Sequence, residues 1–185
     1  STQYYYRVCS TDPCGNGPRC SDEASVATAG ATVVFVNELH YDNVSTDANE
    51  GFEIAATAGT DLAGWSVTFY NGYNGTVSTV ANPNPAPLSG VVADAGGGLG
   101  FAWFPVAGVE NGPTDGFVLV DDSGTVVQFL CYEGTFTAVA GPANGLTCTD
   151  IGVSESNDTT PTDASLQLTG GPGCAYEDFT WTGPV

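Results

Sequence analysis

Short apolar stretches that end at glycine, proline, asparagine or aspartate recur along most of this chain. Such stretches are typical of β-strands, and no window has the 3.6-residue apolar period of an amphipathic helix. The clearest pair is 117–120 and 125–130, which flank Asp121-Asp122-Ser123-Gly124 and predict a β-hairpin. The pattern therefore predicts an all-β fold.

The spacing of these stretches predicts about nine short strands, as in a β-sandwich. The 185 residues include 25 glycines and 11 prolines without a collagen-like repeat, which suits many tight turns. This length allows one sandwich domain and a small appendage. The main expected strands are 33–39, 51–55, 64–70, 99–104, 116–120, 125–132, 165–168 and 179–181.

Two units are expected, 1–30 and 31–185. In the first, Tyr4-Tyr5-Tyr6-Arg7-Val8 has strand composition, 12–18 has turn residues, and 24–28 can return as a strand. This unit resembles the last two strands of a fibronectin type III domain. Because a lone hairpin is marginally stable in water, we expect this N-terminal β-hairpin extension to dock on the body or on a neighbouring molecule.

In the second unit, motifs that run in order from 36–43 to 179–181 resemble the lamin-tail domain of bacterial secreted proteins. The resemblance implies an immunoglobulin-like β-sandwich that serves as an accessory module beside extracellular nucleases or phosphatases, fibronectin-like repeats and surface anchors. The cysteines are not part of the general family pattern, and the catalytic residues of the nucleases are missing. The motifs that carry the resemblance lie at 36–43, 50–54, 61–66, 115–120, 128–134, 149–153, 165–168 and 179–181.

The charge balance excludes several partners. The chain has 21 acidic residues, no lysine, and only Arg7 and Arg19 as strong cations, so its formal net charge is −19. Phosphate binding needs lysine and arginine, so we expect no nucleic-acid partner and no binding to anionic membranes. No apolar run is long enough to span a membrane, and the absence of any methionine favours a processed product or an excised fragment.

The six cysteines indicate disulfides, because no CxxC pair occurs and a single histidine is too few for a typical zinc site. Disulfides imply an oxidising compartment, so an extracellular or cell-surface location is expected. Three cysteines lie in the first 20 residues, so full oxidation requires at least one bond from that segment to the body or to another chain. The alternative is that one or two stay free and buried. The cysteines are Cys9, Cys14, Cys20, Cys131, Cys148 and Cys174.

Oxygen-bearing side chains crowd into one segment that follows the first strand of the body. Calcium prefers six to eight oxygen ligands, so this density predicts a calcium site, although the spacing is not that of an EF-hand. A polar loop stabilised by Asx turns is the alternative interpretation. The candidate ligands are Glu38, Asp42, Asn43, Asp47, Glu50 and Glu53.

Catalytic patterns are weak. His40 is the only imidazole, and no G-x-S-x-G motif accompanies it. Glu38 and Glu53 could form an acid–base pair, but a structural or metal role fits this fold better. We therefore expect no enzyme. An aromatic platform for glycan could come from Tyr70, Tyr73, Trp103 and Phe104, whereas Trp65 and Trp181 are expected in the core.

Two functions remain. The first is a non-catalytic extracellular structural or adhesive module, a subunit of a surface or filamentous assembly held by strand exchange and disulfides. Self-association or neighbouring domains of a larger secreted protein would then be the partners. The alternative is a calcium-dependent glycan- or ligand-binding accessory module of a larger secreted enzyme such as a nuclease.

Overall fold

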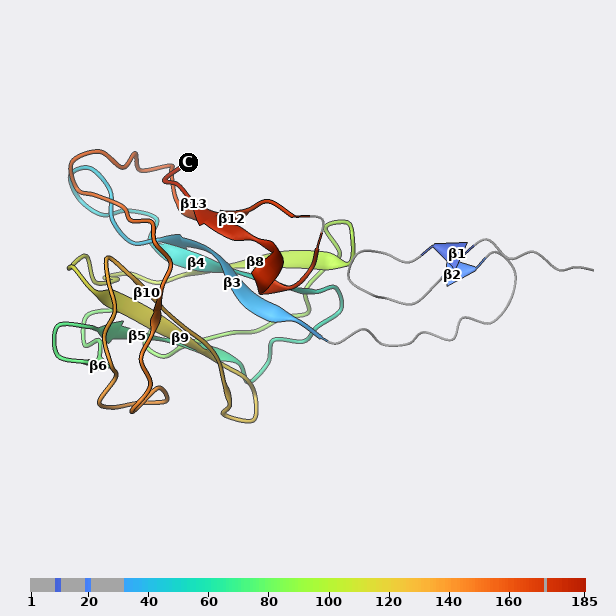
Figure 1. The fold of residues 1–185 in the computed structure, drawn as a ribbon, viewed down its shortest axis with the longest axis horizontal. Helices are drawn as coiled ribbons and strands as arrows, with labels where there is room; N and C mark the ends of the chain where they lie inside the picture. Colours follow the sequence, from blue (N-terminus) through green and yellow to red (C-terminus); the bar gives the residue numbers. More distant parts are fainter. Residues whose placement is uncertain (1–8, 11–18, 21–31, 172) are drawn as a thin grey trace, which may run out of the picture.

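The body of the chain, from residue 32 onward, folds into two β-sheets that face each other (Figure 1). The structure is a computed structural model and describes residues 9–10, 19–20, 32–171 and 173–185. Within these ranges the only helical element is a single 3-10 turn, η1 (Tyr176–Asp178). The predicted all-β sandwich is confirmed.

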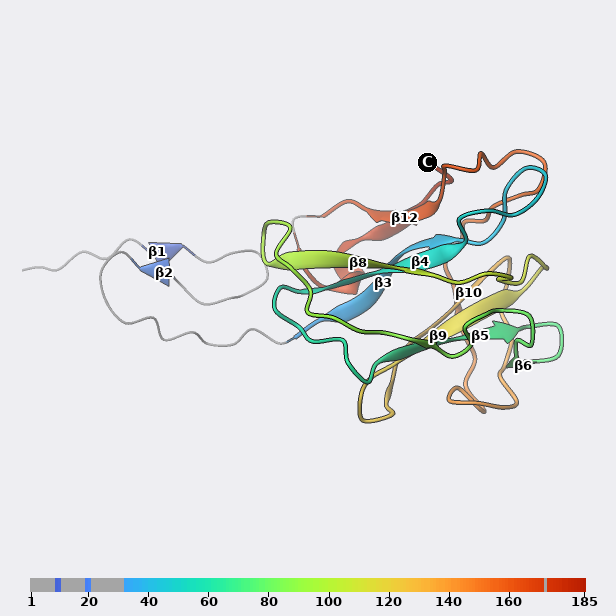
Figure 2. The same cartoon turned by 180° about the vertical axis from the view of Figure 1, so that it is seen from behind.

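The first sheet has the strand order β13-β12-β3-β4-β8, and the second has the order β11-β10-β9-β5-β6, with β7 also paired to β5. Figure 2 shows the same two layers from behind. The strands of the first sheet are β3 (Val34–His40), β4 (Gly51–Thr57), β8 (Leu99–Pro105), β12 (Leu166–Thr169) and β13 (Thr180–Thr182). Those of the second are β5 (Ser66–Asn71), β6 (Thr76–Val77), β7 (Ala86–Pro87), β9 (Asp115–Val120), β10 (Val126–Tyr132) and β11 (Thr149–Asp150).

Aromatic side chains fill the space between the sheets. Phe52 of β4 and Phe69 of β5 lie 5.8 Å apart between ring centroids and so join one sheet to the other. At one end, the rings of Tyr41 and Tyr132 stack with centroids 4.0 Å apart. Trp181 is 7% exposed and belongs to this core, as expected from the sequence. Burial of such large rings is the main stabilising contribution of the fold.

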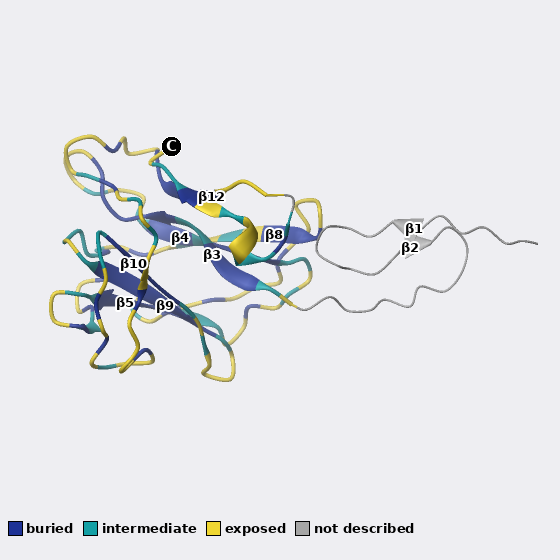
Figure 3. Cartoon of the chain, viewed as in Figure 1, coloured by how far each residue is buried: buried dark blue, intermediate teal, exposed yellow. Residues whose placement is uncertain are grey.

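The central strand β9 is buried on both faces, as Figure 3 shows by its dark blue colour. Phe117 and Leu119 belong to the core between the sheets, whereas Val118 and Val120 belong to a second apolar cluster. A strand buried on both faces has a continuous apolar run instead of alternation, which is what residues 116–120 have.

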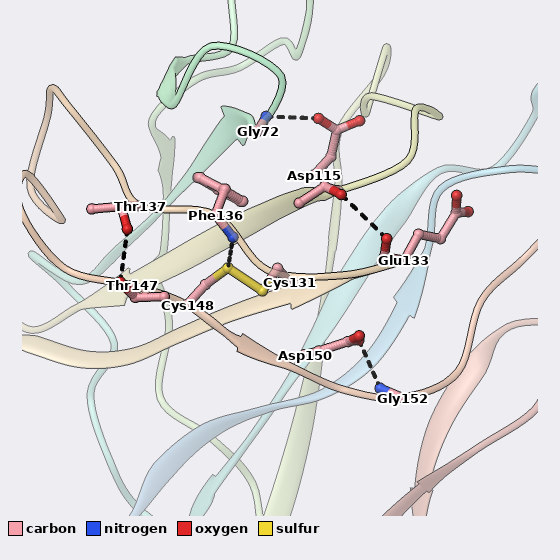
Figure 4. The surroundings of a disulfide bond; sticks show 11 residues. Gly72, Asp115, Cys131, Glu133, Phe136, Thr137, Thr147, Cys148, Asp150 and Gly152 are labelled. Atoms are coloured by element: carbon pink, nitrogen blue, oxygen red, sulfur yellow. Dashed lines mark hydrogen bonds between the residues drawn. A yellow bond between two sulfur atoms is a disulfide. The ribbon is translucent and has the colours of Figure 1, made fainter.

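The second cluster lies under the connection that follows β10. Phe136, Ala138 and Ala143 of this connection pack with Tyr70 and Phe129 of the strands. The disulfide Cys131–Cys148 joins the end of β10 to the far end of the connection (Figure 4). Both sulfur-bearing residues are buried within the cluster, so the covalent bond and the apolar packing hold the same segment.

The β9–β10 hairpin forms where the sequence predicts it, with Val126 opposite Val120 and a register shift before Gln128. The strand after Trp65 also pairs onward through its turn, because β5 is antiparallel to β6. Within a proline-rich stretch of the chain, Ala86–Pro87 forms a short strand with β5. Proline is tolerated there because a short strand at the sheet edge can lack one N–H donor.

In the N-terminal unit, β1 (Cys9–Ser10) pairs antiparallel with β2 (Arg19–Cys20) and forms a separate two-stranded sheet. The strands expected at 4–8 and 24–28, and the turn expected at 12–18, lie outside the described residues. Cys174 is disulfide-bonded.

Replacing Cys131 and Cys148 together by alanine should lower the free energy of unfolding by about 3 kcal/mol, because the bond closes a loop of this size in the unfolded chain. The bonded residues are 17 positions apart. Urea unfolding under oxidising conditions measures the loss. Equal stability of the variant and the parent would mean that the apolar cluster alone holds the connection.

Candidate functional site

Two loops lie side by side at one end of the sandwich, one after β3 and one before β12 (Figures 1 and 2). The N–H of Val44 donates to the carbonyl of Thr160 at 2.9 Å, and the amide of Asn49 donates to the carbonyl of Thr162 at 3.3 Å. This contact brings residues more than 100 positions apart into one polar region, which holds most of the predicted calcium ligands.

The six predicted ligands do not converge on one point. Glu50 accepts the N–H groups of Gly108 and Val109 at 2.9 and 2.8 Å. Glu38 and Glu53 are cross-strand neighbours on β3 and β4. Among the described residues, no three acidic, histidine or cysteine side chains are arranged as a metal would require.

Each of these two strand carboxylates has a polar partner of its own. Glu38 accepts the hydroxyl of Ser165 at 2.6 Å. Glu53 accepts the amide of Asn37 at 2.7 Å. Burial raises the pKa of Glu53, and the neighbouring charge of Glu38 acts in the same direction. The two side chains therefore belong to the sheet surface and not to the loop of the other candidates.

His40 forms a buried ion pair with Glu155. Nδ1 of the ring lies 2.8 Å from Oε1 of Glu155, and the two side chains are 3% and 0% exposed. Nε2 lies 3.0 Å from the carbonyl oxygen of Ala48. Because both ring nitrogens face oxygen acceptors, we assign both as protonated, so the ring carries a positive charge. The hydrogen bond with Glu155 raises the pKa of His40 above its usual value.

Glu155 also organises the backbone around it. Its Oε2 accepts the N–H groups of Tyr41 and Asp42 at 2.6 and 2.8 Å. In return, the hydroxyl of Tyr41 accepts the N–H of Glu155 at 2.8 Å and donates to Glu133 at 2.7 Å. The carboxylate thus joins the loop before β12 to the end of β3. Sequence reasoning missed Glu155, because nothing distinguishes this glutamate from any other acid in a loop.

Asp42 and Asp47 lie against each other within the loop after β3. The carboxyl of Asp42 contacts that of Asp47 and accepts the N–H of Asn157. Asp47 in turn accepts the amide of Asn111 at 2.8 Å and faces the N–H of Asn43 at 3.4 Å. Burial, followed by the charge of Asp47, raises the pKa of Asp42 to about 6.

One oxygen of this pair has no partner. Asp42 is 4% exposed, and its Oδ1 is buried without a hydrogen bond among the described residues. Asn43, by contrast, is occupied in holding the loop. Its Oδ1 accepts the N–H of Ala48 at 2.9 Å, and its amide donates to the carbonyls of Val44 and Thr46.

A shallow polar pocket of about 210 Å³ lies beside this end. Trp103, 41% exposed, forms one wall and packs over Gly51, where an added Cβ would lie 2.8 Å from the ring. The remaining lining includes Glu38, His40, Asn49 and residues 162–165.

The aromatic platform expected from the sequence does not form. Tyr70 is fully buried and donates its hydroxyl to the carbonyl of Ala140. Phe104 stacks on Phe52 at 5.6 Å. Tyr73 is 94% exposed, and only Trp103 lines the polar pocket. Alternation along β8 separates Trp103 from Phe104, since successive side chains point to opposite faces of a sheet.

A second opening, of about 440 Å³, lies between the start of β3 and the first half of β10. We call it the β3–β10 groove, lined by 32–35, 127–130, Thr149 and 175–177. In the described chain, β12 pairs with β3 only at Glu38 and Leu39, and β11 pairs with β10 only at Leu130 and Cys131. Both strands therefore present unpaired edges to the groove.

Gln128 bridges these edges. Its Oε1 accepts the N–H of Val36 at 2.8 Å. This N–H therefore bonds to a side chain and not to the backbone of a neighbouring strand. Its Nε2 is buried and has no hydrogen-bond partner among the described residues. A buried amide donor without an acceptor costs free energy, so an added peptide carbonyl here would be stabilising.

No protein-family model, no curated protein and no solved structure matches this chain. What the structure itself defines is a class: an all-β sandwich with an internal disulfide. The lamin-tail and fibronectin resemblances stay predictions. In the part of the chain that the structure describes, no helix is both long and apolar enough to cross a membrane.

Replacing His40 by leucine should lower the free energy of unfolding by about 3–5 kcal/mol at acidic pH, because it leaves Glu155 buried without its counter-charge. A raised histidine pKa stabilises the fold fully below about pH 6.5, and this contribution is lost as pH rises through the higher folded-state pKa. The difference between parent and variant should therefore shrink above neutral pH.

Urea unfolding between about pH 5 and pH 9 measures this dependence, with His40→Gln as the matched variant that keeps a polar group but cannot titrate in this range. If the free energies of unfolding of the parent and His40→Leu instead differ by the same amount at every pH, the ion pair with Glu155 does not raise the pKa of His40.

Proposed function

We propose that this chain is a non-catalytic extracellular structural module that assembles with further copies of itself. The observation that carries the proposal is the β3–β10 groove, where two half-open strand edges face each other around the unsatisfied amide of Gln128. Exposed edges of this kind accept an additional strand through main-chain hydrogen bonds.

The proposed occupant is the segment 1–8 of a second copy. Its residues Tyr4–Val8 have strand composition, and it carries Arg7. From residue 31 onward the chain has 18 acidic residues and neither lysine nor arginine, and Glu177 lies on the groove lining. Arg7 of the segment and Glu177 of the groove lining carry opposite charges, which favours the encounter of two copies.

The chain connection to the N-terminal unit and a disulfide-bonded cysteine both lie at the β3–β10 groove. Thr32 and Val33, where the N-terminal unit meets the body, line the groove. The disulfide-bonded Cys174 directly precedes Ala175 of the lining. A segment given to the next copy at this position would form a heterologous contact, and such contacts propagate into filaments unless the ring closes.

The native chain should show a mass that increases with concentration, and Val127→Lys should reduce it to the monomer. Val127 is 42% exposed on the groove lining, and a lysine there would obstruct strand addition. Val139→Lys is the matched control, since Val139 is 61% exposed and does not line the groove. Sedimentation under non-reducing conditions measures the masses.

The donor segment is tested by Arg7→Glu against Arg19→Glu, which changes the net charge by the same amount. We expect Arg7→Glu to weaken association at least about tenfold more than the control. A native chain that stays monomeric at every concentration, or two equal effects, would contradict the proposal.

A ligand-binding module is the second candidate, favoured by the exposed Trp103 beside the polar pocket. An aromatic ring next to carboxylate and amide groups suits the apolar face and hydroxyls of a sugar. The pocket offers Glu38, Asn49 and Asp163 as hydrogen-bonding groups.

For this candidate, the native chain should bind an oligosaccharide on a glycan array, and Trp103→Ala should weaken that binding by about tenfold or more. Tyr73→Ala is the control, because Tyr73 is 94% exposed and lies outside the pocket. If the native chain binds no glycan, or if both variants lose the same binding affinity, the glycan-binding function is wrong.

A further inference from the structure

The loop after β3 concentrates negative charge with little to balance it. Asp42 and Asp47 touch, and Glu155 lies next to Asp42, whose N–H it accepts. Among the described residues, the positive group near this loop is His40, and both of its ring nitrogens are already engaged with Glu155 and Ala48.

The unpartnered Oδ1 of Asp42 separates this loop from an ordinary polar turn. A buried carboxylate oxygen normally accepts a hydrogen bond, since its desolvation is otherwise uncompensated. Here the side chain is 4% exposed, and Oδ1 has no hydrogen-bond partner in the described chain. The neighbouring carboxylate of Asp47 repels Asp42 when both groups are ionised. A cation between Asp42 and Asp47 would supply this partner and offset the charge of both carboxylates.

We propose that Asp42 and Asp47 are the two carboxylate ligands of a divalent cation site with calcium chemistry. Backbone carbonyl oxygens and water would complete the coordination sphere, as is common for calcium in loops. Zinc is disfavoured because it prefers nitrogen and sulfur ligands, and the nitrogens of His40 are occupied.

Hydrogen bonds within the chain shape this loop. Asn43 closes it through hydrogen bonds to Ala48, Val44 and Thr46, and Asn111 holds Asp47 from a separate loop. A preformed loop reduces the entropy that a cation would otherwise have to overcome on binding. The site is independent of the groove and of the assembly proposed above.

The site also revises the predicted ligand set. Of the six candidates, the inference keeps Asp42 and Asp47 and assigns the other four to structural roles. Glu53 tests this division, because its carboxylate is half-buried and hydrogen-bonded to Asn37, and the glutamine replacement can still accept that bond.

The experiment is calorimetric melting of the full native chain at about pH 7.5, in a chelator and in calcium chloride. At about a hundredfold excess over the dissociation constant, calcium should raise the melting temperature by about 5–10 °C. Asp42→Asn should abolish this rise, and Glu53→Gln should retain it.

The stability of Asp42→Asn in the chelator shows whether this variant has lost only the calcium site or has also lost its fold. In the chelator it should be at least as stable as the native chain, because the substitution removes the repulsion with Asp47 and adds an amide donor. Titration calorimetry of the native chain with calcium chloride gives the stoichiometry of binding. We expect about one calcium ion per chain for a single site.

Three outcomes would overturn the proposal. They are a native melting temperature that calcium leaves unchanged, a rise that persists in Asp42→Asn, and a rise that Glu53→Gln abolishes. Calcium could also have no effect while the free energy of unfolding increases as pH falls through about 6. That result would assign the Asp42–Asp47 contact to a proton shared by the two carboxyls.

Discussion

The buried carboxylate of Glu155 is the interaction on which the polar end of the sandwich depends. It neutralises His40 and accepts two consecutive backbone N–H groups directly after β3, and its side chain is fully buried. A buried charge is tolerated only when it is paired and hydrogen-bonded. Without Glu155, the loop before β12 would lose its attachment to β3, and the imidazolium of His40 would have no counter-ion.

Backbone N–H groups compensate the negative charge of several partly or fully buried carboxylates. Asp115 is 3% exposed and accepts the N–H groups of Gly72 and Gly112. Glu50 uses two backbone amides in the same manner. Burial nevertheless raises the pKa of Asp115 to about 6. Among the buried carboxylates of the described residues, only Asp42 has an oxygen without a donor, which is why the cation inference concerns that residue.

Burial on both faces of β9 explains the disulfide. A second sheet covers one face, but the other face has only the connection after β10 to cover it. That connection has little regular structure, so apolar packing and the bond Cys131–Cys148 hold it in place. The same connection leaves β11 short, and the short β11 leaves the edge of β10 open at the groove. Core packing and the proposed assembly surface are therefore linked.

The sequence by itself determined the local elements, because strand periodicity, turn residues and apolar runs act over a few neighbouring positions. The hairpin of β9 and β10, the continuous apolar run of β9 and the core position of Trp181 follow from such patterns. Only the tertiary structure decided which side chains meet. Glu155 reaches His40 across 115 positions, Trp103 and Tyr70 separate although both are aromatic strand residues, and four of six predicted ligands turn to other partners. Such contacts depend on how the sheets pack, and one acidic loop residue looks like another until the fold places a partner against it.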